Sequence, residues 1–192
     1  MEKIDELIKE ICTEGVEFKL VGEIVNVISA PKKLNKTEYL DSGKIPIIDQ
    51  GQKFIVAYTN NENAALEKNE YVIFGEHTRE IKFVDFSFAQ GADGVKILLP
   101  KKEILPKFLY YSLRNLNIPS RGYNRHWSIL KEMKIAVPPL EIQSKITSIL
   151  DDLTLLSAKL SAELEAELEA RQKQYEYYRN KLLTFKELVN EG

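Results

Sequence analysis

Apolar and polar residues follow two different patterns along this chain, and the change lies near Pro139. From Val16 to Pro100, β-branched and aromatic residues form short runs that polar turn residues separate, as in short strands joined by loops. The runs lie at residues 19–28, 45–48, 54–58, 71–74 and 95–99. Five or more short strands with polar loops predict a mixed, loop-rich β region.

Helical spacing and one further strand flank this β region. Residues 3–13 place apolar side chains on one face and predict a short amphipathic helix, with Cys12 as a small buried side chain. Residues 103–115 predict a second helix, with Pro106 in the first turn, where proline is tolerated. Residues 135–139 predict a last strand that a double proline ends.

The segment after Pro139 predicts one long helix. Residues 140–185 contain no glycine and no proline, and the strongest helix formers dominate them. An unbroken helix of this length would rise about 65–70 Å at 1.5 Å per residue, far more than the mean globular helix of about 11–12 residues. The sequence therefore divides into a domain of residues 1–138 and a helical region of residues 139–192.

Apolar residues recur along this helix in steps of three and four, so one stripe persists. Such a stripe is too long to be buried on the first domain alone, and we expect part of it to meet another long helix, in a dimer or a partner subunit. The expected contact residues are Ile146, Leu150, Leu153, Leu160, Leu164, Leu168, Tyr175, Tyr178 and Leu182. A helix folded back on its own domain is the alternative.

The composition is that of an ordinary soluble protein. The 192 residues are 44% apolar and carry 27 Lys+Arg against 29 Asp+Glu. One cysteine excludes an internal disulfide and a multi-cysteine zinc site. No apolar run approaches the roughly 20 residues of a membrane span, and the first residues lack the apolar core of a signal peptide. We therefore expect a cytoplasmic protein.

Charge is unevenly distributed along the chain. Residues 101–134 carry 8 Lys+Arg and 2 Asp+Glu, although the net charge of the whole chain is −2. A local basic stretch in a neutral chain is compatible with an anion-binding face. It is equally compatible with a basic loop in solvent.

The motifs of several enzyme classes are absent from the sequence. It has no phosphate-loop motif, no dinucleotide fingerprint and no nucleophile elbow. Its two histidines, His77 and His126, do not have metal-ligand spacing. Glu-x-Lys, which occurs in metal-dependent nucleases, is found three times, at 17–19, 80–82 and 132–134, but no copy follows a Pro-Asp pair. We expect no catalysis, no metal and no cofactor; a small nuclease is the enzymatic alternative.

The loops are more informative, because they carry side chains suited to DNA. Lysines bind phosphates, amides read adenine and arginine reads guanine. The candidate DNA-binding residues are Lys32, Lys33, Lys36, Gln50, Gln52, Lys53, His77, Thr78, Arg79, Lys82, Arg121, Tyr123, Asn124, Arg125 and His126. Each loop alone is compatible with an ordinary solvated loop, whereas their number on one β framework favours an interface. Trp127 is expected in the core.

Several segments together resemble the specificity (S) subunits of type I restriction–modification systems. The Pro-Pro-Leu-Glu segment that opens the helical region and the Gln-Tyr-Glu-Tyr-Tyr-Arg-x-Lys-Leu-Leu segment near its end are specific in combination. The resembling segments are residues 16–24, 43–51, 74–82, 91–96, 137–143, 149–151 and 174–183. The resemblance covers nearly the whole chain.

The resemblance implies an α+β fold. It consists of a mixed, loop-rich β target recognition domain with small helices and a long C-terminal α-helix that forms a coiled coil or antiparallel helix pair. It also implies sequence-specific binding of double-stranded DNA without catalysis. The implied partners are a type I methylation subunit and, through it, a restriction subunit. The alternative is an interaction scaffold that does not bind DNA.

The usual family member has two recognition domains and two helical regions, whereas this chain has one of each and resembles a half-size subunit. Two identical halves about a two-fold axis would pair their long helices in antiparallel fashion. They would then read an inverted repeat with a fixed gap. Whether the second chain is a copy or a different half subunit stays open.

Overall fold

The computed structural model describes residues 6, 9, 13–91 and 93–185. It divides the chain into two compact units, Met1–Thr147 and Ser148–Gly192. Most of the predicted helix over residues 3–13, including Cys12, lies outside the described residues; of the rest, Glu6 and Lys9 are helical and Thr13 lies in a turn.

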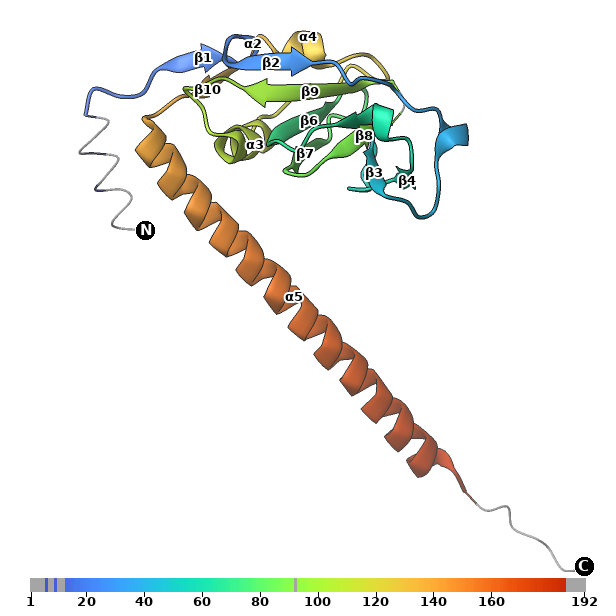
Figure 1. Ribbon diagram of the computed structural model, residues 1–192. Coiled ribbons are helices and arrows are strands. Elements are labelled where there is room, and N and C mark those ends of the chain that lie inside the picture. The colour runs from blue at the N-terminus through green and yellow to red at the C-terminus, as the bar shows by residue number, and fades with distance from the viewer. Residues whose placement is uncertain (1–5, 7–8, 10–12, 92, 186–192) are drawn as a thin grey trace, which may run out of the picture. The chain divides into compact units, whose positions relative to one another are not determined.

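The larger sheet of the first unit is antiparallel throughout, in the order β2-β9-β6-β7 (Figure 1). Its strands are β2 (Val25–Ile28), β9 (Val95–Pro100), β6 (Tyr71–Gly75) and β7 (Ile81–Val84). Strand β6 is buried along its whole length because its side chains pack into two apolar clusters, Val72 and Phe74 in one and Tyr71 and Ile73 in the other. The runs predicted at 71–74 and 95–99 are confirmed as β6 and β9.

A second four-stranded sheet, in the order β4-β3-β8-β5, contains one parallel pair, β3 with β8. Its strands are β4 (Ala57–Thr59), β3 (Ile45–Ile48), β8 (Phe88–Gln90) and β5 (Ala65–Leu66). The run at 45–48 is confirmed as β3, while the run predicted at 54–58 becomes a strand only from Ala57. Strands β5, β7 and β8 were not predicted from the apolar runs.

The run predicted as one strand over residues 19–28 is interrupted by a helical turn. Strand β1 (Phe18–Leu20) pairs with β10 (Lys134–Ala136), then α2 (Val21–Ile24) intervenes before β2 begins. The turn forms because the backbone N–H groups of Val21 and Gly22 donate to the carbonyls of Met133 and Lys131. Val21 and Ile24 are fully buried, so the turn directs both side chains into the core.

Helices α3 (Pro106–Arg114) and α4 (Trp127–Leu130) cover the main core of the first unit together with α2. Pro106 occupies the first turn of α3, as predicted. Trp127 packs against this core, with its ring centroid 6.5 Å from that of Phe74, which confirms the expectation from sequence. Two short 3-10 turns, η1 (Lys36–Glu38) and η2 (Glu62–Ala64), lie in the loops.

The long C-terminal helix is α5 (Leu140–Leu183), close to the predicted 140–185. Its first turns belong to the first unit, because Gln143 is buried and its amide bonds the chain around it. Its Oε1 accepts from the Leu105 N–H at 2.7 Å, and its Nε2 donates to the carbonyls of Glu103 and Pro138. The first compact unit accordingly extends to Thr147, and the functional division at residues 138/139 stays a prediction.

Ile146 was predicted at the helix contact between chains, but it packs against the main core of its own domain. Leu150 is half-buried. The other seven predicted contact residues are exposed; they are Leu153, Leu160, Leu164, Leu168, Tyr175, Tyr178 and Leu182. No helix among the described residues is long and apolar enough to cross a membrane.

Candidate nucleic-acid interface

Loops from four parts of the first unit meet around one open pocket of about 500 Å³. The pocket lies where β3 and β8 end and where β9 begins. The lining residues are Lys33, Leu34, Asn35, Lys36, Asp49, Gln50, Gly51, Asp93 and Tyr123. Four candidates that are far apart in sequence, Lys33, Lys36, Gln50 and Tyr123, are thus brought together.

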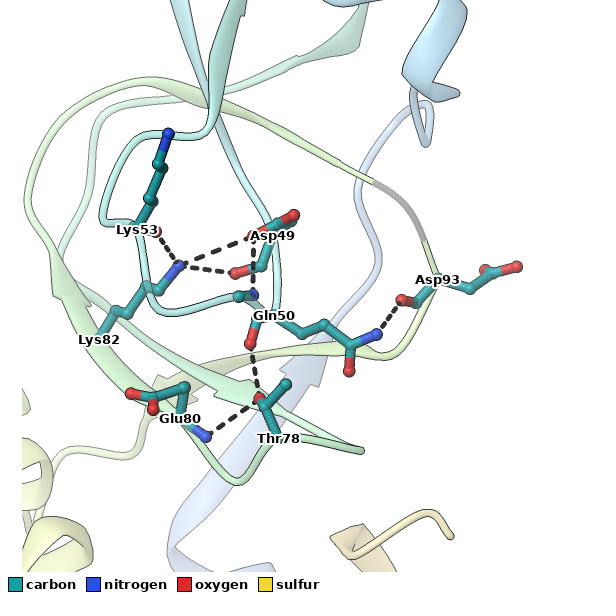
Figure 2. Close-up of polar contacts among 8 residues, drawn as sticks. Asp49, Gln50, Lys53, Thr78, Glu80, Lys82 and Asp93 are labelled. Carbon is teal, nitrogen blue, oxygen red and sulfur yellow. Dashed lines mark hydrogen bonds and ion pairs between the residues drawn. The ribbon is translucent and has the colours of Figure 1, made fainter. Parts of the chain in front are cut away.

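Gln50 bonds three of these loops to one another (Figure 2). Its Oε1 accepts from the His77 N–H at 3.2 Å, and its Nε2 donates to the Asp93 carbonyl at 3.2 Å. Its own carbonyl accepts from the Thr78 hydroxyl at 2.5 Å. Gln50 and Thr78 were expected to contact DNA. Their amide and hydroxyl groups instead bond neighbouring loops and hold these loops in place.

Two glycines allow these loops to approach so closely. Gly94 has a φ of +88°, and a Cβ there would lie 2.8 Å from both the Gln50 amide and the His77 ring. A Cβ on Gly75 would lie 2.2 Å from the Thr78 hydroxyl. Only glycine fits at either position without displacing the loops.

Lys82 was a candidate for DNA contact, but its side chain points inward from β7. Only 6% of the residue is exposed, and its Nζ donates to the carbonyls of Asp49 at 2.9 Å and Lys53 at 2.6 Å (Figure 2). Burial lowers the pKa of Lys82, while the nearby Asp49 carboxylate opposes that shift. Lys82 thus supports loop 49–53 from inside and is not placed to reach a ligand.

His126 is a second candidate that the structure places in the interior. The side chain is fully buried; its Nε2 accepts from the Arg121 N–H at 3.0 Å. Because that nitrogen accepts, the proton lies on Nδ1, which donates to the Glu76 carbonyl at 2.8 Å. His126 therefore anchors the 121–125 loop to the end of β6 rather than facing solvent.

Glu76 is a buried carboxylate that the sequence did not single out. Its carboxylate lies 3.8 Å from both Lys96 Nζ and Arg125 Nε, while its N–H donates to the Gly94 carbonyl. Arg125 itself is exposed. Glu76 therefore joins the 121–125 loop to the backbone at Gly94. In the sequence, only the two nearby glycines, Gly91 and Gly94, indicated a turn in this region.

An aromatic pair lies beside the pocket. The rings of His77 and Tyr123 stack with centroids 4.5 Å apart and an interplanar angle of 11°. Tyr123 is 82% exposed, so one face of this pair is open to solvent. Within the described part of the chain, His77 Nδ1 is buried and has no hydrogen-bond partner.

Three other candidates have partners on the protein. Lys32 Nζ bonds Glu38 at 2.5 Å and lowers the pKa of that carboxyl. Arg79 Nη1 donates to the Ile118 carbonyl at 2.8 Å, and Asn124 donates to the Arg121 carbonyl. The candidates whose side chains are exposed and bond no described group are Lys36, Gln52, Lys53 and Arg121.

The pocket residues that the sequence did not single out include Asn35, Asp49 and Asp93. Asp93 forms an ion pair with Lys33 at 3.0 Å, and this hydrogen bond lowers the pKa of its carboxyl. Among the described residues, no three His, Cys, Asp or Glu side chains gather as a metal site. The arrangement can offer cations, amides, carboxylates and an aromatic face to a polar ligand.

Comparisons with known proteins agree on one family. Residues 13–170 match the family model "Type I restriction modification DNA specificity domain". The chain is 35% identical over 187 residues to the EcoR124I/EcoR124II specificity subunit of Escherichia coli, covering 90% of this chain and 45% of that protein. It is 34% identical to a putative type I specificity subunit of Haemophilus influenzae, covering 90% of this chain and 47% of the relative.

Solved structures share the fold. The type I S subunit from M. genitalium superposes with a TM-score of 0.64 at 22% identity, covering 89% of this chain and 46% of that one. The HsdS subunit from Thermoanaerobacter tengcongensis gives a TM-score of 0.51 at 17% identity, covering 83% of this chain and 45% of that one. The chain spans about half the length of the relatives it matches. It belongs to the type I restriction–modification DNA specificity family.

Proposed function

We propose that the first unit recognises a specific sequence in double-stranded DNA and itself catalyses no reaction. The main observation in support is the convergence of four polar loops on one open pocket, held in register by Gln50, Lys82 and His126. Pre-organised loops on a β scaffold suit recognition, because their geometry is fixed before the ligand arrives. The named relatives are specificity subunits of type I enzymes, which supports the same function.

We assign phosphate contacts to some of the exposed candidate residues and base contacts to others. Lys36, Lys53 and Arg121 carry unpaired charges among the described residues and suit phosphates. Arg79, Arg125 and Gln52 remain candidates for base edges, with Tyr123 offering an aromatic face. If Arg79, Arg125 or, in place of a phosphate contact, Arg121 reads a base, its replacement by alanine costs about 1–3 kcal/mol of binding free energy.

The exposed stripe of α5 pairs with the same stripe of a second chain. Leu160, Leu164 and Leu168 are each more than half exposed in the single chain, which leaves apolar surface for a partner helix. An antiparallel pair of identical chains holds two recognition units at a fixed separation and reads an inverted repeat with a fixed gap. A different half subunit in place of the copy would give an asymmetric site.

Such a dimer directs a methylation subunit and, through it, a restriction subunit to the recognised sequence. This assignment rests on the resemblance to specificity subunits of type I restriction enzymes, because the chain covers only about half of those relatives. The alternative, an interaction scaffold that does not bind DNA, uses the same α5 stripe.

Selection from a random pool of double-stranded DNA tests the proposal, with the full chain alone and with its methylation subunit. We expect a defined bipartite inverted repeat and an affinity that falls steeply with salt, because phosphate contacts release counterions. Recovery of no preferred sequence under either condition, with the helix still capturing the methylation subunit, would favour the scaffold.

A matched charge variant makes this test sharper. Lys36→Gln with Lys53→Gln removes two cations from the pocket side and should reduce the salt slope by about 2. Lys102→Gln with Lys134→Gln is the control. Lys102 follows the opposite end of β9 from the pocket, and Lys134 lies on β10. Equal slopes for the two double variants would contradict the placement of the interface.

A further inference from the structure

The ion pair between Lys33 and Asp93 is an unexplained feature of the pocket. Lys33 Nζ lies 3.0 Å from Asp93 Oδ1, and 61% and 80% of the two side chains are exposed. Both residues line the pocket. Ion pairs with this exposure contribute little to stability, about 0–1 kcal/mol at most sites. Folding alone therefore does not account for a fixed carboxylate on this surface.

The backbone on both sides of the pair is fixed to the same part of the fold. Lys33 forms a parallel β-bridge with Gln90, and the N–H of the buried Leu34 donates to the Gln90 carbonyl at 3.0 Å. The Asp93 carbonyl accepts from Gln50 Nε2, and Gly94 follows it with a positive φ. Both charges are therefore held in place relative to the end of β8.

Asp93 is the one pocket carboxylate, among the described residues, that is turned to solvent. The other, Asp49, is 19% exposed at its side chain, accepts from the Gly51 N–H at 2.8 Å, and lies 3.9 Å from Lys82 Nζ. Phosphates repel a carboxylate that faces DNA, and a hydrogen bond from a base can offset this repulsion. In the major groove, the cytosine N4 amino group is the donor that Asp and Glu accept from.

Building on the proposed function, we infer that Lys33 and Asp93 together read one G·C base pair in the major groove. Lys33 Nζ donates to guanine N7 and O6, and the Asp93 carboxylate accepts from N4 of the paired cytosine. A G·C pair presents two adjacent acceptors and one donor on its major-groove edge, which is the pattern that a paired lysine and carboxylate complement. The pair reads the base pair as a unit, and Asp93 determines specificity at that position.

The test is sequence selection from a random DNA pool with the full chain and its variants Asp93→Ala and Lys33→Met. The wild-type chain should select a G·C pair at a position of each half-site that both variants read poorly. We expect discrimination at that one position to fall on the order of tenfold. Asp93→Ala should also bind unrelated DNA more tightly, because it removes a negative charge from the interface.

Lys36→Met is the matched control, because Lys36 lines the same pocket without an ion pair to any described residue. It should weaken binding uniformly and leave the selected sequence unchanged. An unchanged sequence for Asp93→Ala, a loss at an A·T position, or a loss spread over all positions would each overturn the inference. If the wild-type chain selects no sequence at all, the proposed function fails first.

Discussion

Gln50 and Gln52 lie two residues apart on one loop but have different surroundings. Gln50 bonds His77 and Asp93 through its amide, whereas Gln52 is exposed and bonds no described group. Gln50→Ala should lower the free energy of unfolding by about 1 kcal/mol, the usual value of such hydrogen bonds. Gln52→Ala should stay within about 0.5 kcal/mol of wild type. Chemical denaturation of the two variants measures the difference.

In DNA selection, the same two variants distinguish a residue that positions the loops from a residue that contacts a base directly. Gln50→Ala removes the side-chain bonds to His77 and Asp93 and keeps only the backbone bond to Thr78, so preference should weaken at several positions of the half-site. Loss of Gln52 should affect one position at most. A single-position change for Gln50→Ala, with unchanged stability, would show that its amide leaves the loop network and reads a base.

Lys82 gives a prediction on pH. Lys82→Met leaves the carbonyls of Asp49 and Lys53 without their donor, at a cost of about 1–3 kcal/mol in the free energy of unfolding. Burial disfavours the charged amine and lowers the pKa of Lys82 below the ordinary 10.5. At neutral pH the burial of this charge therefore offsets part of the stability that its hydrogen bonds contribute. Between the lowered folded pKa and 10.5, the unfolded chain binds a proton on Lys82 that the folded chain has released.

In that window the contribution of Lys82 to the free energy of unfolding increases with pH. The neutral amine still has two N–H groups for the two carbonyls. The stability difference between wild type and Lys82→Met should therefore be smallest below the folded pKa and widen as pH rises towards 10.5. Urea unfolding of both proteins at three alkaline pH values measures this difference. A difference that narrows over this range would contradict the internal role of Lys82.

The inward positions of Lys82 and His126 were not evident from the loops that contain them. In β7, exposure alternates, and Lys82 shares its inward face with Val84. Recognising residues 81–84 as a strand would not have revealed this, because Ile81 and Phe83 would be taken as the inward face and Lys82 as exposed. His126 has no local signal either, because its burial depends on the Glu76 carbonyl, fifty residues away in sequence.

At the level of elements, the sequence predicts a helix or strand reliably where the residues of that element alone show the pattern. Helix α5 follows from composition alone, and β3, β6 and β9 follow from continuous apolar runs. Strands β5 and β8 have two and three residues, too few to show a period, and β8 exists through its parallel pairing with β3. Helix α2 depends on carbonyls of residues 131 and 133, which no local pattern reveals.

At the same scale, we predict that the length of α5 sets the gap between the two half-sites. Leucines recur every fourth residue from Leu156 to Leu168, so duplicating residues 161–164 extends the helix and keeps the stripe. Four residues add about 6 Å at 1.5 Å per residue, close to two base pairs at 3.4 Å each. The duplicated chain should select the same half-sites with a longer gap.

Sequence selection checks this outcome directly. Glu163→Gln with Glu167→Gln is a control of unchanged length, because both carboxylates are exposed and form only i,i+4 pairs on the helix surface. It should keep the original gap. An unchanged gap in the duplicated chain would exclude α5 as the spacer.

For the whole molecule, the proposed reading of a bipartite site requires two recognition domains connected by the helices. Gln143 connects the start of α5 to residues 103–105 and to Pro138, so the helix continues directly from the folded domain. In the proposed dimer, the length of α5 sets the half-site spacing, whereas a flexible linker would allow many gaps. The apolar stripe of α5 then decides whether two such domains act together.

Two matched double variants test that stripe. Leu160→Glu with Leu164→Glu places carboxylates on the stripe, while Ala162→Glu with Ala166→Glu places them about 200° away around the helix, at 100° per residue. The charge change is identical, and glutamate is a good helix former. Both variants should keep the helix content of wild type in circular dichroism.

Sedimentation should then show that the leucine variant is monomeric and that the alanine variant self-associates as wild type does. A monomer reaches only one half-site, so the leucine variant should lose the affinity gained by linking two sites while retaining weak binding to a single half-site. This combination follows because the stripe and the loops act independently: one sets the number and separation of readers, and the other sets the sequence read. Dimers that persist in the leucine variant would place the contact on another surface of the chain, and the gap of the target would no longer follow from the length of α5.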